Sequence, residues 1–105
     1  MKNKKLIFIQ LNELNFDYIA EYAKKYNLLN FKKLLNFKKI HTSSEKEYKL
    51  LEPWIQWVSV FSGLDANDHK IFRLGDSNKF NYQYFSNTIE DAGFDVGLIS
   101  PMNIV

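Results

Sequence analysis

The side chains best suited to chemistry lie in three places along the chain. Asn12 and Glu13 follow directly after an apolar run, Glu52 precedes a proline, and His69 and Arg73 lie in a polar stretch. Carboxylate and amide oxygens ligate divalent cations, and the planar fork of an arginine binds tetrahedral oxyanions. The sequence therefore offers Asn12, Glu13 and Glu52 as candidate metal ligands. His69 and Arg73 are candidate contacts for an anionic substrate.

Each of these residues also has a purely structural interpretation. A polar pair after an apolar run is expected of an ordinary strand-to-helix turn, and Glu52 is a favourable charge near a first helical turn. Arg73 can form a weak surface ion pair with Asp76, and a single histidine such as His69 more often packs in a loop than binds a ligand. Both interpretations stay open from the sequence alone.

Two apolar segments are expected to form the sheet that positions these residues. Residues 6–11 form a continuous apolar run, typical of a parallel strand buried on both faces, and residues 94–99 resemble a second such strand. The order of strand, helices and strand indicates a right-handed crossover. The predicted fold class is α/β, a partial three-layer α/β/α arrangement with parallel strands near 5–11 and 94–99. Ligands bind at the carboxyl ends of such strands, so Glu13 and Glu52 are expected to open into a common cleft.

Three or four helices are expected to flank the sheet, from apolar residues at helical spacing and from signals at the helix ends. They are predicted over residues 15–26, 30–35, 53–63 and 84–93. Pro53 suits a first helical position and Gly63 a C-terminal cap. Trp54 and Trp57 fall in the third helix, either as core aromatics or as a pocket wall. The polar stretches 40–49 and 65–79 are predicted to be loops.

Three segments carry a family resemblance. They are residues 6–14, an apolar strand closing on Asn12 and Glu13; residues 57–72, with Ser62-Gly63 at a helix end and Asp68-His69-Lys70-Ile71 after it; and residues 92–99, beginning Ala92-Gly93-Phe94. Together they resemble the amino-terminal part of the alkaline phosphatase and sulfatase superfamily. In that family the corresponding strand ends in a metal-binding Asp-Gly, the helix after the nucleophile closes with Thr-Gly before a His-Gly-Ile, and a strand entry begins Ala-Gly-Tyr. The middle segment is the most specific.

The resemblance implies a metal-dependent hydrolase or transferase of phosphate, phosphonate or sulfate esters, with Zn²⁺, Mn²⁺ or Mg²⁺ bound in the complete protein. Asn12 stands where the family has its metal-binding Asp, and Pro53 stands where the nucleophile is expected. No Ser or Thr lies between Glu45 and Val58 to replace it. No catalytic residue is therefore assigned, and the chain alone is predicted to be inactive. The alternative function is a non-catalytic binding or assembly module that retains the fold.

Size and charge bound the remaining possibilities. A chain of 105 residues is expected to form a single domain over 1–105, the amino-terminal segment of a larger domain. Its 14 Lys and Arg against 12 Asp and Glu leave a net charge of +2, too balanced to indicate nucleic-acid binding. The absence of cysteine excludes disulfides and thiolate chemistry. We expect either a homo-oligomer or a carboxy-terminal remainder to cover the exposed sheet edges.

No targeting or membrane-spanning segment is recognised in the sequence. The apolar run after the amino-terminal lysines is shorter than a secretory core, and no stretch approaches the roughly 20 apolar residues of a membrane span. The predicted location is therefore the cytoplasm.

Overall fold

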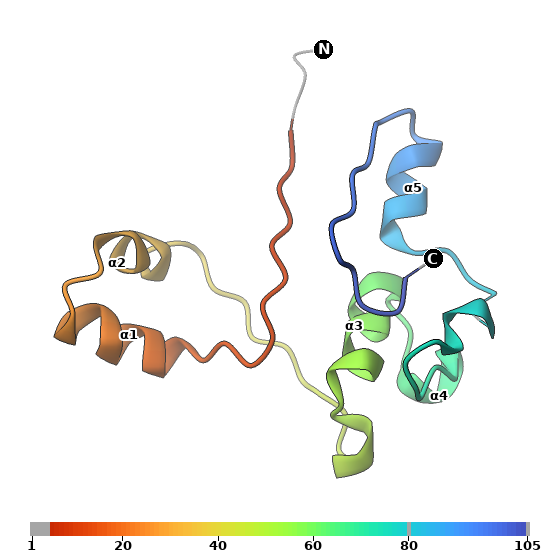
Figure 1. Cartoon of the computed structure of the whole chain (residues 1–105), viewed down its shortest axis with the longest axis horizontal. Helices are drawn as coiled ribbons and strands as arrows, with labels where there is room; N and C mark the ends of the chain where they lie inside the picture. Colours follow the sequence, from red (N-terminus) through yellow and green to blue (C-terminus); the bar gives the residue numbers. More distant parts are fainter. Residues whose placement is uncertain (1–4, 80, 105) are drawn as a thin grey trace. The chain divides into compact units, whose positions relative to one another are not determined.

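The computed structural model describes residues 5–79 and 81–104, and its contacts divide the chain into two compact units, Met1–His41 and Thr42–Val105. Figure 1 follows the order of the elements along the chain. They are α1 (Phe16–Lys25), α2 (Leu29–Leu35), the 3₁₀ turn η1 (Tyr48–Leu50), α3 (Pro53–Ser62), α4 (Ala66–His69), the 3₁₀ turn η2 (Asp76–Lys79) and α5 (Phe85–Asp91). The prediction that residues 1–105 form a single domain stays a prediction.

The first unit contains an antiparallel pair of helices. Asn15 caps α1 as predicted, because its Oδ1 accepts hydrogen bonds from the backbone N–H groups of Asp17 at 2.8 Å and Tyr18 at 3.3 Å. Ile19 and Ala23 are buried on the face of α1 where α2 packs. The second helix begins at Leu29, one residue before the predicted cap Asn30, and no side chain caps it.

The second unit holds two small apolar clusters. The first joins Val58, Phe61, Ile71 and Tyr84, with Trp57, Phe85 and Ile104 packed against it. The second joins Leu50, Ile55 and Ala66, with Trp54 beside it. Helix α3 contributes to both clusters because its apolar residues occupy more than one face. Trp54 and Trp57 therefore pack against the core, as the structural interpretation of these two residues predicted, rather than forming the wall of a pocket.

Helices α3 and α5 form where their end signals predicted them. Pro53 is the first residue of α3, and Gly63 closes it in the left-handed region at φ 72°. Tyr84 precedes α5, with its backbone N–H donating to Asn87 Oδ1 at 2.9 Å, and Gly93 follows at φ 83°. The stretches predicted as loops contain short helical turns, η1 in the first and α4 and η2 in the second.

The predicted α/β fold is wrong, because the described residues form helices and turns and contain no strand. Residues 5–11 and 94–99, the two predicted parallel strands, are instead irregular segments. Most of their apolar side chains are exposed, as Ile7 at 83% and Ile99 at 94% illustrate. An apolar run becomes a strand only when a second backbone accepts and donates its hydrogen bonds. Among the described residues no ladder of hydrogen bonds forms between strands, so the predicted right-handed crossover is not formed either.

Candidate functional site

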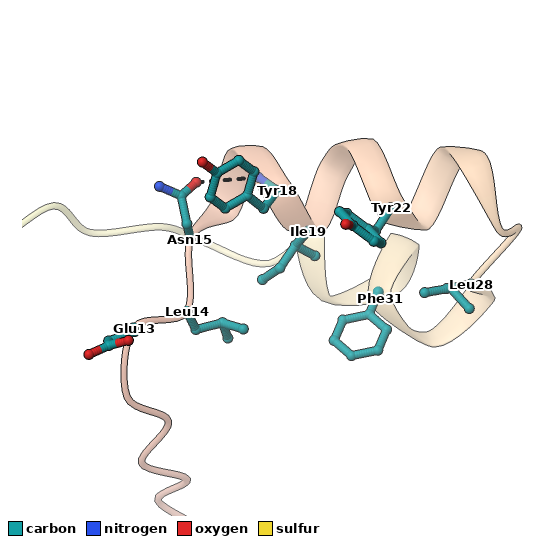
Figure 2. Close-up of a pocket in the computed structure, with 8 residues that line it drawn as sticks. All are labelled: Glu13, Leu14, Asn15, Tyr18, Ile19, Tyr22, Leu28 and Phe31. Atoms are coloured by element: carbon teal, nitrogen blue, oxygen red, sulfur yellow. Dashed lines mark hydrogen bonds between the residues drawn. The ribbon is translucent and has the colours of Figure 1, made fainter.

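The candidate ligands Asn12 and Glu13 lie in the turn that leads into α1, and both are exposed. Glu13 has a φ of 55°, an uncommon value for a residue other than glycine or asparagine. It lies at one end of a hollow of about 250 Å³ (Figure 2). The rest of the lining is mostly apolar and aromatic, from Leu14, Asn15, Tyr18, Ile19, Tyr22, Leu28 and Phe31. The turn thus presents one carboxylate beside an apolar surface.

Glu52 is the N-cap residue of α3 and is half-buried. Its side chain makes no capping hydrogen bond to its own helix; its backbone carbonyl instead accepts from Ile55 at 2.9 Å and Gln56 at 3.0 Å. The carboxylate is therefore not used to close the helix end. Glu52 belongs to the second unit and Glu13 to the first, and their predicted common cleft stays a prediction.

His69 is buried at 3% exposure, and both of its ring nitrogens are engaged. The backbone N–H of Ile71 donates to Nδ1 at 3.0 Å, and Ser59 Oγ lies 3.1 Å from Nε2. Burial lowers the pKa of His69, and the carboxylates of Glu45, Asp68 and Asp65 oppose that shift to a smaller extent. The ring is therefore held neutral, with its proton on Nε2 and directed at Ser59.

This tautomer determines what the pair of His69 and Ser59 can do. A general base must accept the hydroxyl proton of its nucleophile, but here Nε2 donates to the hydroxyl oxygen. The pair is thus a structural link that ties the end of α4 to α3. At the start of α4, Glu45 Oε1 accepts from the N–H of Ala66 at 3.0 Å and fixes that end as well. His69 can contact a substrate only after one of its present hydrogen bonds breaks.

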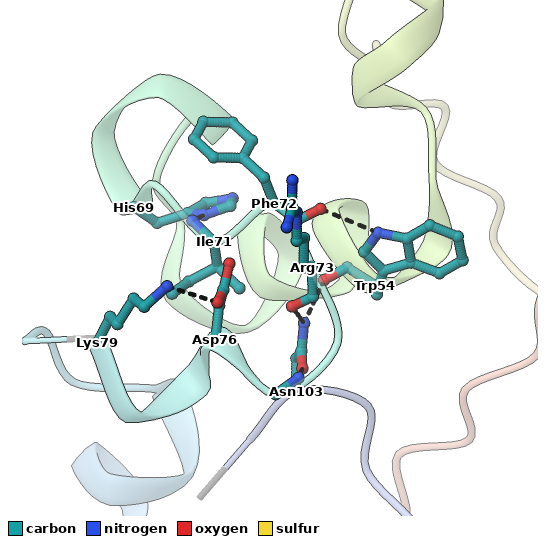
Figure 3. Close-up of polar contacts among 9 residues, drawn as sticks. Trp54, His69, Ile71, Phe72, Arg73, Asp76, Lys79 and Asn103 are labelled. Carbon is teal, nitrogen blue, oxygen red and sulfur yellow. Dashed lines mark hydrogen bonds and ion pairs between the residues drawn. The ribbon is translucent and has the colours of Figure 1, made fainter.

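Arg73 is exposed, in the loop that follows α4 (Figure 3). The nearby carboxylate of Asp76 pairs with Lys79 at 2.7 Å, and this hydrogen bond is the main cause that lowers the pKa of Asp76. Arg73 contributes only a weak Coulombic effect to that pKa. The ion-pair partner of Asp76 is thus Lys79 and not Arg73, which the structural interpretation had predicted. The predicted contact of Arg73 with an anionic substrate stays a prediction.

Sequence reasoning missed Asn103, which organises the polar contacts drawn in Figure 3. Its Nδ2 donates to the carbonyls of Trp54 and Arg73, both at 3.0 Å, and its Oδ1 accepts from the N–H of Gly75 at 3.1 Å. Its own carbonyl accepts from the Tyr84 hydroxyl at 3.0 Å. The side chain is buried and the backbone is left-handed, at φ 56°. No local pattern marks this residue, because its partners lie far away in the sequence.

The candidate ligands do not form a metal centre by themselves. Within residues 5–79 and 81–104, no three His, Asp or Glu side chains lie close enough together to hold one ion. A structural or catalytic zinc site has at least three protein ligands. The divalent metal that the resemblance implies therefore stays a prediction for the complete protein.

Comparison with other proteins adds no family to this picture. No family model, characterised relative or solved structure matches the chain. None of the helices in the described part of the chain has the length and apolar character needed to cross a bilayer.

Proposed function

We propose that this chain is the amino-terminal part of a metal-dependent hydrolase or transferase of phosphate or sulfate esters. In this proposal the 105 residues alone do not turn over such a substrate. The proposal rests on the resemblance of residues 57–72 to the alkaline phosphatase and sulfatase superfamily. The two segments matched as strands, residues 6–14 and 92–99, add no support, because the described residues form no strand there.

The local structure of that segment supports the proposal. A helix begins at Pro53 and ends at a left-handed Gly63, followed by a turn that carries a buried His69. The resemblance predicts this order of helix, glycine and histidine. Glu52, with a carboxylate not used for capping, lies at the start of the same helix, where a metal contact is predicted.

The absence of turnover follows from the residues themselves. Pro53 has no nucleophilic atom, and the nearest hydroxyl with a histidine partner, that of Ser59, accepts a hydrogen bond from His69 rather than donating one. An active site also needs more metal ligands than the described residues bring together. Further protein must supply them.

Hydrolysis of a chromogenic phosphodiester with added Zn²⁺, Mn²⁺ or Mg²⁺ tests this function. We expect no metal-stimulated hydrolysis by the 105-residue chain, and hydrolysis by a protein carrying further sequence with Asp and His ligands. Glu52→Ala should abolish the activity of that longer protein, whereas Glu47→Ala, which removes an exposed ion pair with Lys49, should not. Turnover by the short chain that is lost in Glu52→Ala would contradict the proposal.

A second candidate function is a non-catalytic binding or assembly module. The exposed apolar side chains of residues 6–11 favour it, because Leu6, Ile7 and Ile9 are each more than two-thirds exposed. Surfaces of this kind mark sites where another protein segment binds. Calorimetric titration of the longer protein separates the two candidates: Zn²⁺, Mn²⁺ or Mg²⁺ binding that is lost in Glu13→Gln favours the enzyme, and no binding favours the module.

A further inference from the structure

Residues 5–13 have an unusual combination of exposure, composition and conformation. The segment runs without helix before α1 and is drawn as an extended trace in Figure 1. Its uncharged core, residues 6–11, contains neither proline nor glycine. Exposed apolar segments of this composition pair readily with other strands.

The alternation of side chains along an extended backbone divides the segment into two faces. Ile7, Ile9 and Leu11 share one face, and their exposed fractions are 83%, 72% and 54%. Gln10 and Asn12 lie on the opposite face with Leu6 and Phe8. One face is therefore wholly apolar between its ends, while the other is mixed.

The charges at the two ends of the apolar face are opposite. Lys5 precedes the apolar residues and Glu13 follows them, and both side chains are exposed. The left-handed backbone of Glu13 ends the extended stretch, so these two long side chains flank a ladder rather than sit inside it. A segment with a cation at one end and an anion at the other is complementary to its own reverse.

We propose that residues 6–12 pair antiparallel with the same residues of a second copy of this chain, about a two-fold axis at Ile9. In this register Ile7 faces Leu11 of the other copy, Ile9 faces Ile9, and Lys5 meets Glu13 at both ends. The six side chains of Ile7, Ile9 and Leu11 in the two copies then gather on one face. A closed two-fold pair of this kind satisfies the backbone groups of both segments along their shared edge.

Charge selects this arrangement over the main alternative. Parallel in-register pairing would place Lys5 beside Lys5 and Glu13 beside Glu13, and like charges opposite each other destabilise a strand pair. A shift by one residue in the antiparallel register would place Gln10 opposite Ile7 and break the apolar face. The pairing concerns the chain as it stands and is independent of the proposed hydrolase function.

Sedimentation equilibrium over a wide range of protein concentration tests the pairing. We expect the wild-type mass to rise from one chain to two. Lys5→Glu and Glu13→Lys, each placing like charges at both ends, should weaken the dimer by about 2- to 30-fold, and their combination should restore it. Lys38→Glu, the same charge change after α2, is the matched control and should leave the dimer unchanged. Ile9→Asp should abolish pairing, because it places two carboxylates opposite each other at the centre of the apolar face.

Three results would overturn the proposal. The first is a wild-type chain that stays monomeric at every concentration. The second is a dimer that responds to Lys5→Glu no more than to Lys38→Glu. The third is a double reversal as weak as either single one, since only antiparallel pairing restores both contacts. Because residues 5–13 precede the helices and are exposed, circular dichroism should give the same helix content for all the variants. The test measures mass alone, so its result is independent of whether the protein hydrolyses an ester.

Discussion

Replacement of Asn103 by alanine should be among the most damaging single changes in the second unit. The change removes three side-chain hydrogen bonds, at 3.0, 3.0 and 3.1 Å, from a buried position. At about 0.5–1.5 kcal/mol each, their loss lowers the free energy of unfolding by about 2–4 kcal/mol. Alanine at φ 56° adds about 1 kcal/mol of backbone strain.

Two further variants separate these contributions. Asn103→Gly removes the same hydrogen bonds, but glycine tolerates the left-handed backbone. This variant should therefore be more stable than Asn103→Ala by most of the backbone strain of about 1 kcal/mol. Asn103→Asp keeps the shape and the acceptor for Gly75, but it directs a carboxylate oxygen at the carbonyls of Trp54 and Arg73. It should therefore destabilise the unit even though it is nearly isosteric.

Urea denaturation followed by tryptophan fluorescence measures these effects, because Trp54 and Trp57 both lie in the second unit. The reasoning fails if Asn103→Ala unfolds within about 0.5 kcal/mol of the wild type, the range of ordinary surface substitutions. It fails equally if Asn103→Asp is as stable as the wild type, because the two donated hydrogen bonds would then contribute nothing.

Two other predictions concern acid and backbone conformation. The pKa of His69 is lowered in the folded chain from its ordinary value of 6.5. Just below pH 6.5, His69 therefore takes up a proton in the unfolded chain but not in the folded chain. The titration of His69 should therefore leave the free energy of unfolding independent of pH above pH 6.5. Below pH 6.5 this free energy should fall by at most about 1.4 kcal/mol per pH unit, until the pKa of His69 in the folded chain is reached. Denaturation across this range should lose that dependence in His69→Gln but keep it in His41→Gln, which alters an exposed histidine; equal slopes in both variants would refute it. Gly63→Ala should cost about 1 kcal/mol in a thermal or urea melt, because φ is 72° while no atom lies within 4 Å of an added Cβ. Gly97→Ala, with equal space and no left-handed φ, should be near neutral, and a similar loss at both positions would contradict this explanation.

The helices could be predicted where their signals are local. Asn15, Pro53 and Gly63 act within one or two turns of their own position, through a capping hydrogen bond, a fixed φ and a left-handed backbone. Asn30 failed as a cap because the turn after α1 already directs the chain into α2 at Leu29. That turn is closed by the hydrogen bond from Leu28 N–H to the Ala23 carbonyl.

The strands and the polar site could not be predicted in the same way. An apolar run such as residues 6–11 specifies extended backbone but not the partner that would make it a strand. The contact of His69 with Ser59 spans ten residues and that of Asn103 with Trp54 spans 49, and no spacing within either segment reveals them. The sequence therefore indicated that His69 had a role in its loop, but not which atoms its ring would face.

The position of Asn103 has a consequence for how the chain is made. Its side chain joins the first turn of α3 to the loop of Arg73 and Gly75 through contacts that span 28, 30 and 49 residues, so the second unit is incomplete until Asn103 has left the ribosome. At synthesis rates of about 5–20 residues per second, the interval between Trp54 and Asn103 lasts about 2–10 s. Throughout that interval the carbonyls of Trp54 and, once made, Arg73 face water, while α1 and α2 have already emerged. The second unit therefore becomes complete later than the first, because it waits for Asn103.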